Sequence, residues 1–576
     1  MAVGTTTSQA RQAPQSFQSL SKRQLIGTVI GLQLTLLLAA LDNTIVGTAM
    51  PQIIAQLDGF DRYAWVTTAY LLTSTIAVPI FGKLSDLFGR KWIFLGGAVA
   101  FVATSALCGA AGSIPGLGGG GMNQLIAFRA LQGLSAGVIT GLTFTIIGDI
   151  FPPADRGKYQ GLFSGVWGLA SVFGPTLGGY ITDSLSWRWV FYVNLPVGIA
   201  AVAVLFVAFP DIRPQGVRRA IDWLGVTTLT AGLVPLLLAL TWVTNYGWIS
   251  TRVLSLLGVA VAMLGAFIWA ESRAAEPIMP LTLFKSRIVA VSSISLFLTG
   301  MGMFGSILFI PLFMQAVLNI SATRSGSLLT PLMLMLVFGS ILSGQLISRL
   351  GRYKFLAIGG LAIMASGMFM MAGMGIDTTQ GIVVRNMIIV GLGLGLVMPL
   401  YTLIVQNAVP QRMLGVATAS TQFFRSIGGT VGAAVFGSIM LGRYRSTFDA
   451  GIPQGVSAQA VEPFRNPLQL SQIMGQLQKT FATIPNGPAI LGQLLGNVKV
   501  ALVNGIGGVF LIGAIVVAAA TVINVFLPEI PLRKTFAPPE ATAEVASPEG
   551  AYATGKTIGQ QGAPVPVLAA VGQDDD

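Results

Sequence analysis

The amino-acid sequence predicts an all-α polytopic membrane protein, built from two six-helix bundles with two further helices inserted between them. Three observations lead to this prediction. The 576-residue chain is 53% hydrophobic and only 9% charged, whereas soluble domains have about 25% charged residues. Apolar runs long enough to cross a bilayer recur along most of the chain. Short motifs of the first half return in the second half in the same order.

The bilayer crossings are expected as helices of about 20 apolar residues each. Glycine is abundant, with 71 residues in the chain, as in helices whose backbones approach closely within a bilayer. Fourteen apolar runs follow one another, approximately at 24–48, 64–82, 92–112, 123–150, 157–181, 188–209, 222–243, 252–271, 288–317, 325–348, 355–375, 382–408, 413–441 and 500–527.

Basic residues set the expected orientation. With a cytoplasmic N-terminus, most lysines and arginines fall in cytoplasmic loops and tails, as the positive-inside rule requires. The segment 443–499 is then extracellular, and its "LQLSQIMGQLQKTF" run is a candidate amphipathic helix against the outer leaflet. The chain is therefore expected in the plasma (inner) membrane with both termini cytoplasmic. The short outer loops would carry only Arg62, Arg188, Arg252 and Arg324.

An internal repeat divides the chain. "GKLSDLFGRK" at Gly82 is echoed by "GQLISRLGRY" at Gly344, and Arg129 is matched by Arg385. Spans 1 to 6 and 9 to 14 are therefore expected to be related bundles, which suits alternating access. The predicted parts are a disordered N-terminus 1–23, a first bundle 24–210, a linker 211–287 with two membrane helices, a second bundle 288–530 and a disordered tail 531–576.

The composition argues against several classes of function. The net charge of +12 is spread over the loops, which does not favour a nucleic-acid partner. Histidine is absent and Cys108 is the single cysteine, so no metal site or catalytic thiol is indicated. No cluster of histidines or cysteines is present, which argues against an enzyme. Any proton carrier is then sought among the 21 acidic residues, while a channel or a receptor stays as an alternative to a transporter.

A series of motifs resembles the fourteen-span drug:proton antiporter family of the major facilitator superfamily. The resemblance covers residues 24–530, and its motifs occur in the family's order. It departs at Leu87, where a basic residue is usual, and the second copy of the loop motif has Ser348 in place of Asp86, a degeneracy that is common in the superfamily. The motifs are "LDNTIVGTAMPQI" (41–53), "WVTTAYLL" (65–72), "GKLSDLFGRK" (82–91), "RALQGLSAG" (129–137), Gly165 with "GPTLGG" (174–179), "WRWVFYVNLPVG" (187–198), "EPIMPLTLFKSR" (276–287) and "FFRSIGGTVG" (423–432).

The resemblance implies a proton-coupled antiporter that expels amphipathic drugs across the plasma membrane, as in multidrug efflux and antibiotic resistance. Cationic or neutral compounds are expected as substrates. The proton motive force would drive transport without a cofactor, and the partners would be protons, lipids and small molecules, with the protein a monomer. One alternative is export of an endogenous metabolite, peptide or lipid-like molecule on the same fold.

Three charges inside predicted spans are candidate functional residues. Asp42 lies in an apolar helix, where a carboxylate costs about 2.5–3.5 kcal/mol unless it faces a partner or a cavity. The resemblance implies that Asp42 couples transport to protons, and Arg129 is the cation expected to shift the pKa of this carboxylate. The alternatives are that Asp42 caps a broken helix and that Arg129 snorkels to the outer headgroups. Arg425 lies too deep to snorkel and is expected to face the cavity, or else to bond backbone carbonyls.

Two motifs suggest moving parts. In the loop after span 2, the resemblance implies that Asp86 latches spans 2 and 11 in the outward-facing state, whereas topology alone is the simpler interpretation. The gating-loop candidates are Gly82, Asp86, Gly89, Arg90 and Lys91. In span 5, small residues at helical spacing are expected to let helices slide, with simple packing as the alternative. These antiporter-motif residues are Gly165, Gly174, Pro175, Gly178 and Gly179.

Other polar and aromatic residues have weaker assignments. Asp149 and Asp222 are expected to serve helix ends rather than coupling. Five aromatic residues are candidates for stacking on a substrate, although most aromatic residues in membrane helices are interface anchors or packing. They are Trp65, Tyr70, Trp167, Phe423 and Phe424.

Overall fold

The computed structural model describes most of the chain between residues 20 and 532. It divides into two units, Met1–Thr535 and Phe536–Asp576, and all described residues belong to the first. Of the predicted tails, only 20–23 and 531–532 are described, and Lys22 already lies in the first helix. The described ranges are 20–57, 62–114, 120–211, 220–320, 328–453, 456, 458–465, 470–483 and 486–532.

The first bundle is formed by helices α1 to α7. We name the two ends of the molecule after α1, as the Lys22 end and the Leu57 end. Short connections make consecutive long helices antiparallel, so α2 returns to the Lys22 end. The bundle comprises α1 (Lys22–Leu57), α2 (Tyr63–Phe88), α3 (Arg90–Gly109), α4 (Gly120–Ile150), α5 (Pro153–Ser184), the short α6 (Trp189–Tyr192) and α7 (Asn194–Ala208).

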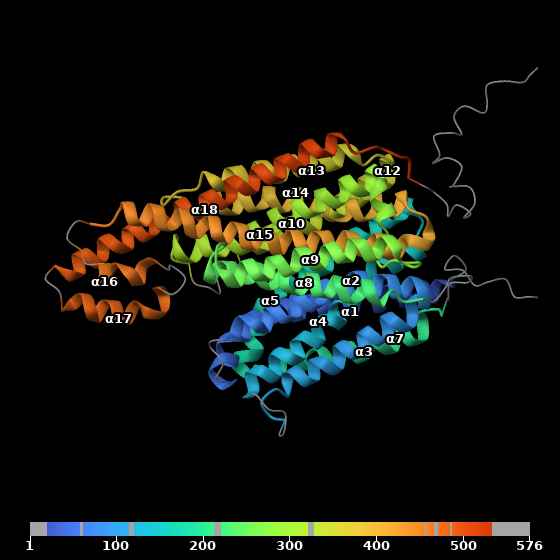
Figure 1. Cartoon of the computed structure of the whole chain (residues 1–576), viewed down its shortest axis with the longest axis horizontal. Coiled ribbons are helices and arrows are strands. Elements are labelled where there is room, and N and C mark those ends of the chain that lie inside the picture. Colours follow the sequence, from blue (N-terminus) through green and yellow to red (C-terminus); the bar gives the residue numbers. More distant parts are fainter. Residues whose placement is uncertain are drawn as a thin grey trace, which may run out of the picture. The chain divides into compact units, whose positions relative to one another are not determined.

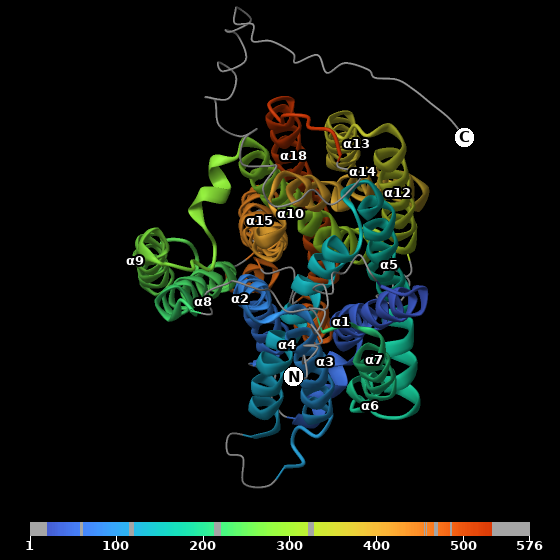
Figure 2. The same ribbon diagram turned by 90° about the vertical axis from the view of Figure 1, so that its right-hand side faces the viewer.

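Two inserted helices and a second bundle follow. α8 (Trp223–Tyr246) and α9 (Thr251–Arg273) pack on each other beside α2 and α15, and a short η3 (Leu281–Lys285) leads to the second bundle (Figure 2). The second bundle comprises α10 (Arg287–Ala316), α12 (Thr330–Leu350), α13 (Lys354–Ala372), α14 (Gln380–Ala408), η4 (Gln411–Met413), α15 (Leu414–Ala450), α16 (Ala458–Val461), η5 (Glu462–Arg465), α17 (Leu470–Ala482) and α18 (Gly487–Val525).

Thirteen of the helices are long and apolar enough to cross a membrane, counted among the described residues by length and composition alone. The expected span 157–181 is absent from that count although α5 is 32 residues long. Polar residues and glycines lower its hydropathy, because α5 packs between α1 and α12. The predicted fold class, two six-helix bundles with two inserted helices, is confirmed by this arrangement.

Each bundle has its own apolar core. The largest core cluster draws all its buried residues from 288–527, and two others lie wholly within 32–209. The bundles meet where α5 packs on α12 and where α2 packs on α15. The main cores of the two halves are therefore separate, although α5 and α12 pack on each other as extensively as helices within one bundle.

The segment 443–499 differs from the expected extracellular loop. α15 continues to Ala450 and α18 already begins at Gly487, because these extensions pack against η5 and α17 through buried aromatic residues. α17 spans most of the predicted amphipathic run, but Phe481 is buried and its ring lies 6.0 Å from that of Phe464. The apolar face of α17 therefore contacts the protein itself instead of lipid. Figure 1 shows α16 and α17 together at the Leu57 end.

Candidate functional site

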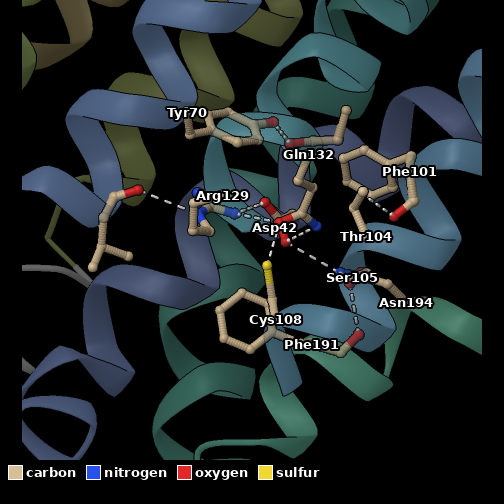
Figure 3. A network of polar contacts seen from close by, with 12 residues as sticks. Asp42, Tyr70, Phe101, Thr104, Ser105, Cys108, Arg129, Gln132, Phe191 and Asn194 are labelled. Atoms are coloured by element: carbon tan, nitrogen blue, oxygen red, sulfur yellow. Dashed lines mark hydrogen bonds and ion pairs between the residues drawn. The ribbon is translucent and has the colours of Figure 1, made fainter. Parts of the chain in front are cut away.

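Asp42 forms a buried ion pair in the middle of the first bundle (Figure 3). It lies near the centre of α1, which is 36 residues long, and its exposed fraction is 0%. One carboxylate oxygen, Oδ2, is 2.5 Å from Nη1 of Arg129, which is 1% exposed. Arg129 therefore does not snorkel to the surface, and Asp42 does not cap a broken helix.

The second oxygen of Asp42 is held by two amides. Oδ1 accepts from Nε2 of Gln132 at 3.0 Å and from Nδ2 of Asn194 at 3.2 Å. Gln132 lies one turn after Arg129 on α4, so both side chains leave the same face of that helix. Asn194 is the first residue of α7. Each oxygen of the carboxylate thus has a partner, and the partners come from two other helices of the same bundle, α4 and α7.

Arg129 is enclosed by further partners. Its Nε donates to the carbonyl of Val66 at 3.3 Å, and Nη1 donates to Oε1 of Gln132 at 2.9 Å. The ring of Tyr70 lies 4.1 Å from the guanidinium carbon, and the ring of Phe191 lies 5.9 Å away. Tyr70, a candidate for substrate stacking, is 4% exposed and covers Arg129 instead. Removing either member of such a pair leaves an uncompensated buried charge, which costs about 3–5 kcal/mol.

Close helix packing brings α4 to this position. A Cβ at Gly137 of α4 would lie 2.6 Å from Cβ of Ala77 on α2, so only glycine permits the approach. Further polar groups surround the pair. Nδ2 of Asn194 donates to Oγ of Ser105 at 3.1 Å, and Sγ of Cys108 lies 3.4 Å from Oε1 of Gln132.

Sequence reasoning missed Gln132, Asn194 and Ser105. Their signal was an amide or a hydroxyl within an apolar span; Gln132 and Asn194 even lie in motifs that carry the family resemblance.

The gating-loop residues form a second buried ionic cluster at the Lys22 end. Nη2 of Arg90 lies 2.5 Å from Oδ1 of Asp86, and its Nε donates to Oδ2 of Asp149 at 2.8 Å. Asp149 was expected to serve a helix end; instead it binds Arg90. Gly89 joins α2 to α3 with a φ of 98°, a conformation that favours glycine. Lys91 lies apart, with Nζ donating to the carbonyl of Phe206 at 2.9 Å.

Asp86 also reaches the second bundle. Its Oδ2 accepts from the backbone N–H of Val416 at 2.9 Å, one of the free N–H groups in the first turn of α15. A carboxylate is favoured there by the helix dipole. A Cβ at Gly82 would lie 2.5 Å from Cβ of Ala419, so α2 and α15 meet closely.

The expected latch partner was wrong. It was span 11, which corresponds to α13, but the partner is α15. The inserted helices α8 and α9 add two spans before the second bundle, so the helix that packs on α2 lies two spans later in the chain than expected. α13 packs against α14 and α18 instead.

Gln406 of α14 joins the bundles beside this latch. Its Nε2 donates to the carbonyl of Phe144 on α4 at 2.9 Å and to Oγ1 of Thr418 on α15 at 3.0 Å. Its Oε1 accepts from Nε2 of Gln160 on α5 at 3.0 Å. All three side chains are at most 2% exposed, so the bundles are in dry contact at the Lys22 end.

The antiporter-motif residues face in different directions. Gly174 and Gly178 pack against α1, since a Cβ at Gly178 would lie 2.9 Å from the carbonyl oxygen of Ile45. A Cβ at Gly165 would meet only Val337 of α12, at 3.4 Å, and Gly179 faces open space. Gly179 therefore does not share the packed face expected for it. Pro175 lies inside α5.

The other candidates lie in separate places. Asp222 caps α8 as expected, accepting from the N–H of Gly225 at 2.8 Å. Trp65 makes an edge contact with Trp242 of α8, with ring centroids 6.4 Å apart. Phe424 packs between the rings of its neighbour Phe423, at 5.6 Å, and Phe284, at 5.7 Å. Trp167 packs against the first-bundle core. Arg425 donates to Gln422 and Met398 of the second bundle.

Comparison with known proteins assigns the family. Residues 32–433 match the model of the Major Facilitator Superfamily. The chain is 40% identical over 545 residues to the multidrug transporter protein MdtP of Bacillus subtilis (strain 168), covering 92% of this chain and 97% of that protein. It is 36% identical over 511 residues to multidrug resistance protein 3 of the same strain, covering 88% and 96%.

Solved structures agree with this fold. The proton:xylose symporter XylE superposes with a TM-score of 0.57 at 14% identity, covering 88% of this chain and 97% of the symporter. The human organic anion transporter MFSD10 has a TM-score of 0.56 at 14% identity, covering 86% and 100%. The chain therefore belongs to the Major Facilitator Superfamily and is a multi-pass membrane transporter, not an enzyme.

Proposed function

We propose that this transporter is a proton-coupled antiporter that exports amphipathic small molecules across the plasma membrane by alternating access. The observation that carries the proposal is the fully buried pair of Asp42 and Arg129, the one ion pair of the described residues that lies in mid-membrane. The two relatives named as multidrug proteins support export.

Proton coupling follows from the charge balance of this pair. When Asp42 takes up a proton, the guanidinium of Arg129 loses its compensating charge in a buried site. The conformation that holds the pair dry then becomes less favourable by several kcal/mol, and one that hydrates Arg129 gains population. Asp42 is fully buried here, so proton exchange belongs to another conformation of the cycle.

The contacts at the Lys22 end supply the second half of the cycle. We assign this end to the cytoplasm, because the basic loops lie there. Two contacts close that side: Asp86 of α2 accepts from an N–H in the first turn of α15, and Gln406 bonds to both bundles. Opening requires these bonds to break, and water then replaces them, so the net cost of each is small enough for a reversible gate.

Asp42→Asn tests the proposal. In proteoliposomes that contain a pH-sensitive dye, the wild-type chain should move protons against a panel of amphipathic cations, neutral drugs, acids and candidate metabolites. Asp42→Asn keeps the shape of the side chain but cannot release a proton, so counterflow should disappear at normal expression. Asp183→Asn, at an exposed site on α5, is the matched control and should transport normally. Proton counterflow that survives in Asp42→Asn would remove Asp42 from the mechanism.

A further inference from the structure

A ladder of side-chain contacts runs between α14 and α15 from the Lys22 end toward mid-membrane. The first rung, nearest the Lys22 end, is Gln406 with Thr418, at 3.0 Å. The next is Thr402 with Thr421, at 3.4 Å. The third rung, nearest mid-membrane, is Met398 with Arg425, whose Nη1 lies 3.3 Å from the Met398 sulfur. The residues on α14 are spaced four apart, so they share one face of that helix.

The first rung, at the Lys22 end, is also a contact between the two bundles. Gln406 reaches Phe144 and Gln160 of the first bundle there. Burial decreases along the ladder, since Thr418 is 0% and Thr421 1% exposed, while Arg425 is only partly buried. Arg425 therefore lies two rungs beyond the closed contact, on the face of α15 that also carries Thr418 and Thr421.

Arg425 lacks a negatively charged partner among the described residues. A guanidinium has five N–H donors, and its hydrogen-bond partners here are an amide oxygen of Gln422 and a thioether, which is a weak acceptor. Asp42 cannot serve, because both its oxygens are taken by groups of the first bundle. A cation at this depth without a counter-charge is costly, so it marks a functional site.

We propose that Arg425 binds the acidic group of an exported amphipathic organic anion, a carboxylate or a sulfonate. The inference rests on the proposed export function and names its substrate class. Guanidinium pairs with such groups through two parallel hydrogen bonds. The apolar body of the anion lies against Met398, which is partly buried. In the described part of the chain, the mid-membrane sites offer this unpaired positive charge and no unpaired carboxylate, which favours anions over the cations expected from the resemblance.

A matched pair of probes tests the proposal by binding, without any proton gradient. The full chain in lipid nanodiscs is titrated with dansylated undecanoic acid and with its methyl ester, followed by dansyl fluorescence. The wild-type chain should bind the acid at least about tenfold more tightly than the ester, as expected for a charge-assisted pair. In Arg425→Gln the two affinities should come within about twofold of each other, while the ester binds as in wild type. Arg425→Lys keeps the charge and should retain part of the preference.

Controls separate this inference from its alternatives. Arg443→Gln, at an exposed position further along α15, should keep the full preference. Equal binding of acid and ester by wild type overturns the proposal, and so does a preference that persists in Arg425→Gln. Displacement of the acid by an equal concentration of inorganic phosphate would show a site for any small anion and would also overturn it. Loss of proton counterflow for every compound would instead refute the proposed antiport while leaving the binding preference intact.

Discussion

The two bundles treat charge in the membrane differently. In the first, Asp42 and Arg129 balance each other and have further partners from α4 and α7. In the second, α10 carries no acidic residue, and Arg425 has no carboxylate partner among the described residues. Among the described residues, Arg385, the repeat partner of Arg129, bonds only to the side chain of its neighbour Asn386, at 3.2 Å. A balanced pair can change its net charge by one proton, whereas an unmatched cation attracts an anion, so we propose different roles for the two halves.

The largest effect should come from breaking the balanced pair. Arg129→Gln leaves the carboxylate of Asp42 buried without its cation and should lower the free energy of unfolding by about 3–5 kcal/mol. Arg385→Gln removes an arginine that has no carboxylate partner in the described part of the chain, and it should cost less than about 1 kcal/mol. Thermal unfolding in detergent, followed by intrinsic fluorescence, measures both.

The double variant Asp42→Asn with Arg129→Gln sharpens this comparison. It removes both charges, so part of the lost stability should return, as expected for two residues in direct contact. Equal losses for Arg129→Gln and Arg385→Gln would show that the bundles do not differ in this respect.

A smaller effect is expected where α5 passes α1, within two turns of Asp42. A Cβ at Gly178 would lie 2.9 Å from the carbonyl oxygen of Ile45, whereas a Cβ at Gly179 has open space. Gly178→Ala should therefore cost about 1–3 kcal/mol by overpacking and reduce export, while Gly179→Ala should leave both unchanged. Export from intact cells and thermal unfolding measure the pair; matching behaviour of the two variants would show that α5 does not use this face.

Much of the fold could be predicted from the sequence, because hydropathy and the repeated motifs both reflect constraints of the bilayer. The pairing of Asp42 with Arg129 was predictable as well, since a charge in an apolar span needs a partner. The bonds from the amides of Gln132 and Asn194 to Asp42 could not be predicted, because an uncharged polar residue in a span can be accommodated in many positions without such a partner.

Two features depended on tertiary packing that hydropathy does not report. The extensions of α15 and α18 carry Arg443, Arg445 and Lys499, so they do not resemble membrane spans, yet Leu494 and Phe448 are fully buried between them and the neighbouring helices. Gln406, which joins the two bundles, could not be found from the sequence either, because its three partners lie on three other helices.

The contact that joins the two bundles offers the finest test. A Cβ at Gly415, in the first turn of α15, would lie 2.6 Å from Oδ2 of Asp86 and 2.7 Å from Nη1 of Arg90. Gly415→Ala should push Asp86 off the N-terminus of α15 and favour opening of the Lys22 end by about 1 kcal/mol, roughly fivefold in the equilibrium.

Opening can be read at Leu403, which is fully buried and faces α5, since a Cβ at Gly157 would lie 3.2 Å from its Cδ1. With Cys108→Ser removing the single native cysteine, Leu403→Cys should react with a water-soluble maleimide about fivefold faster when Gly415→Ala is added. Gly442→Ala, on the same helix but with nothing within 4 Å of the new Cβ, should leave the rate unchanged. Because the acid of Asp86 comes from the first bundle and the free N–H from the second, an unchanged rate in Gly415→Ala would mean that the bundles are held together by Gln406 and its neighbours alone.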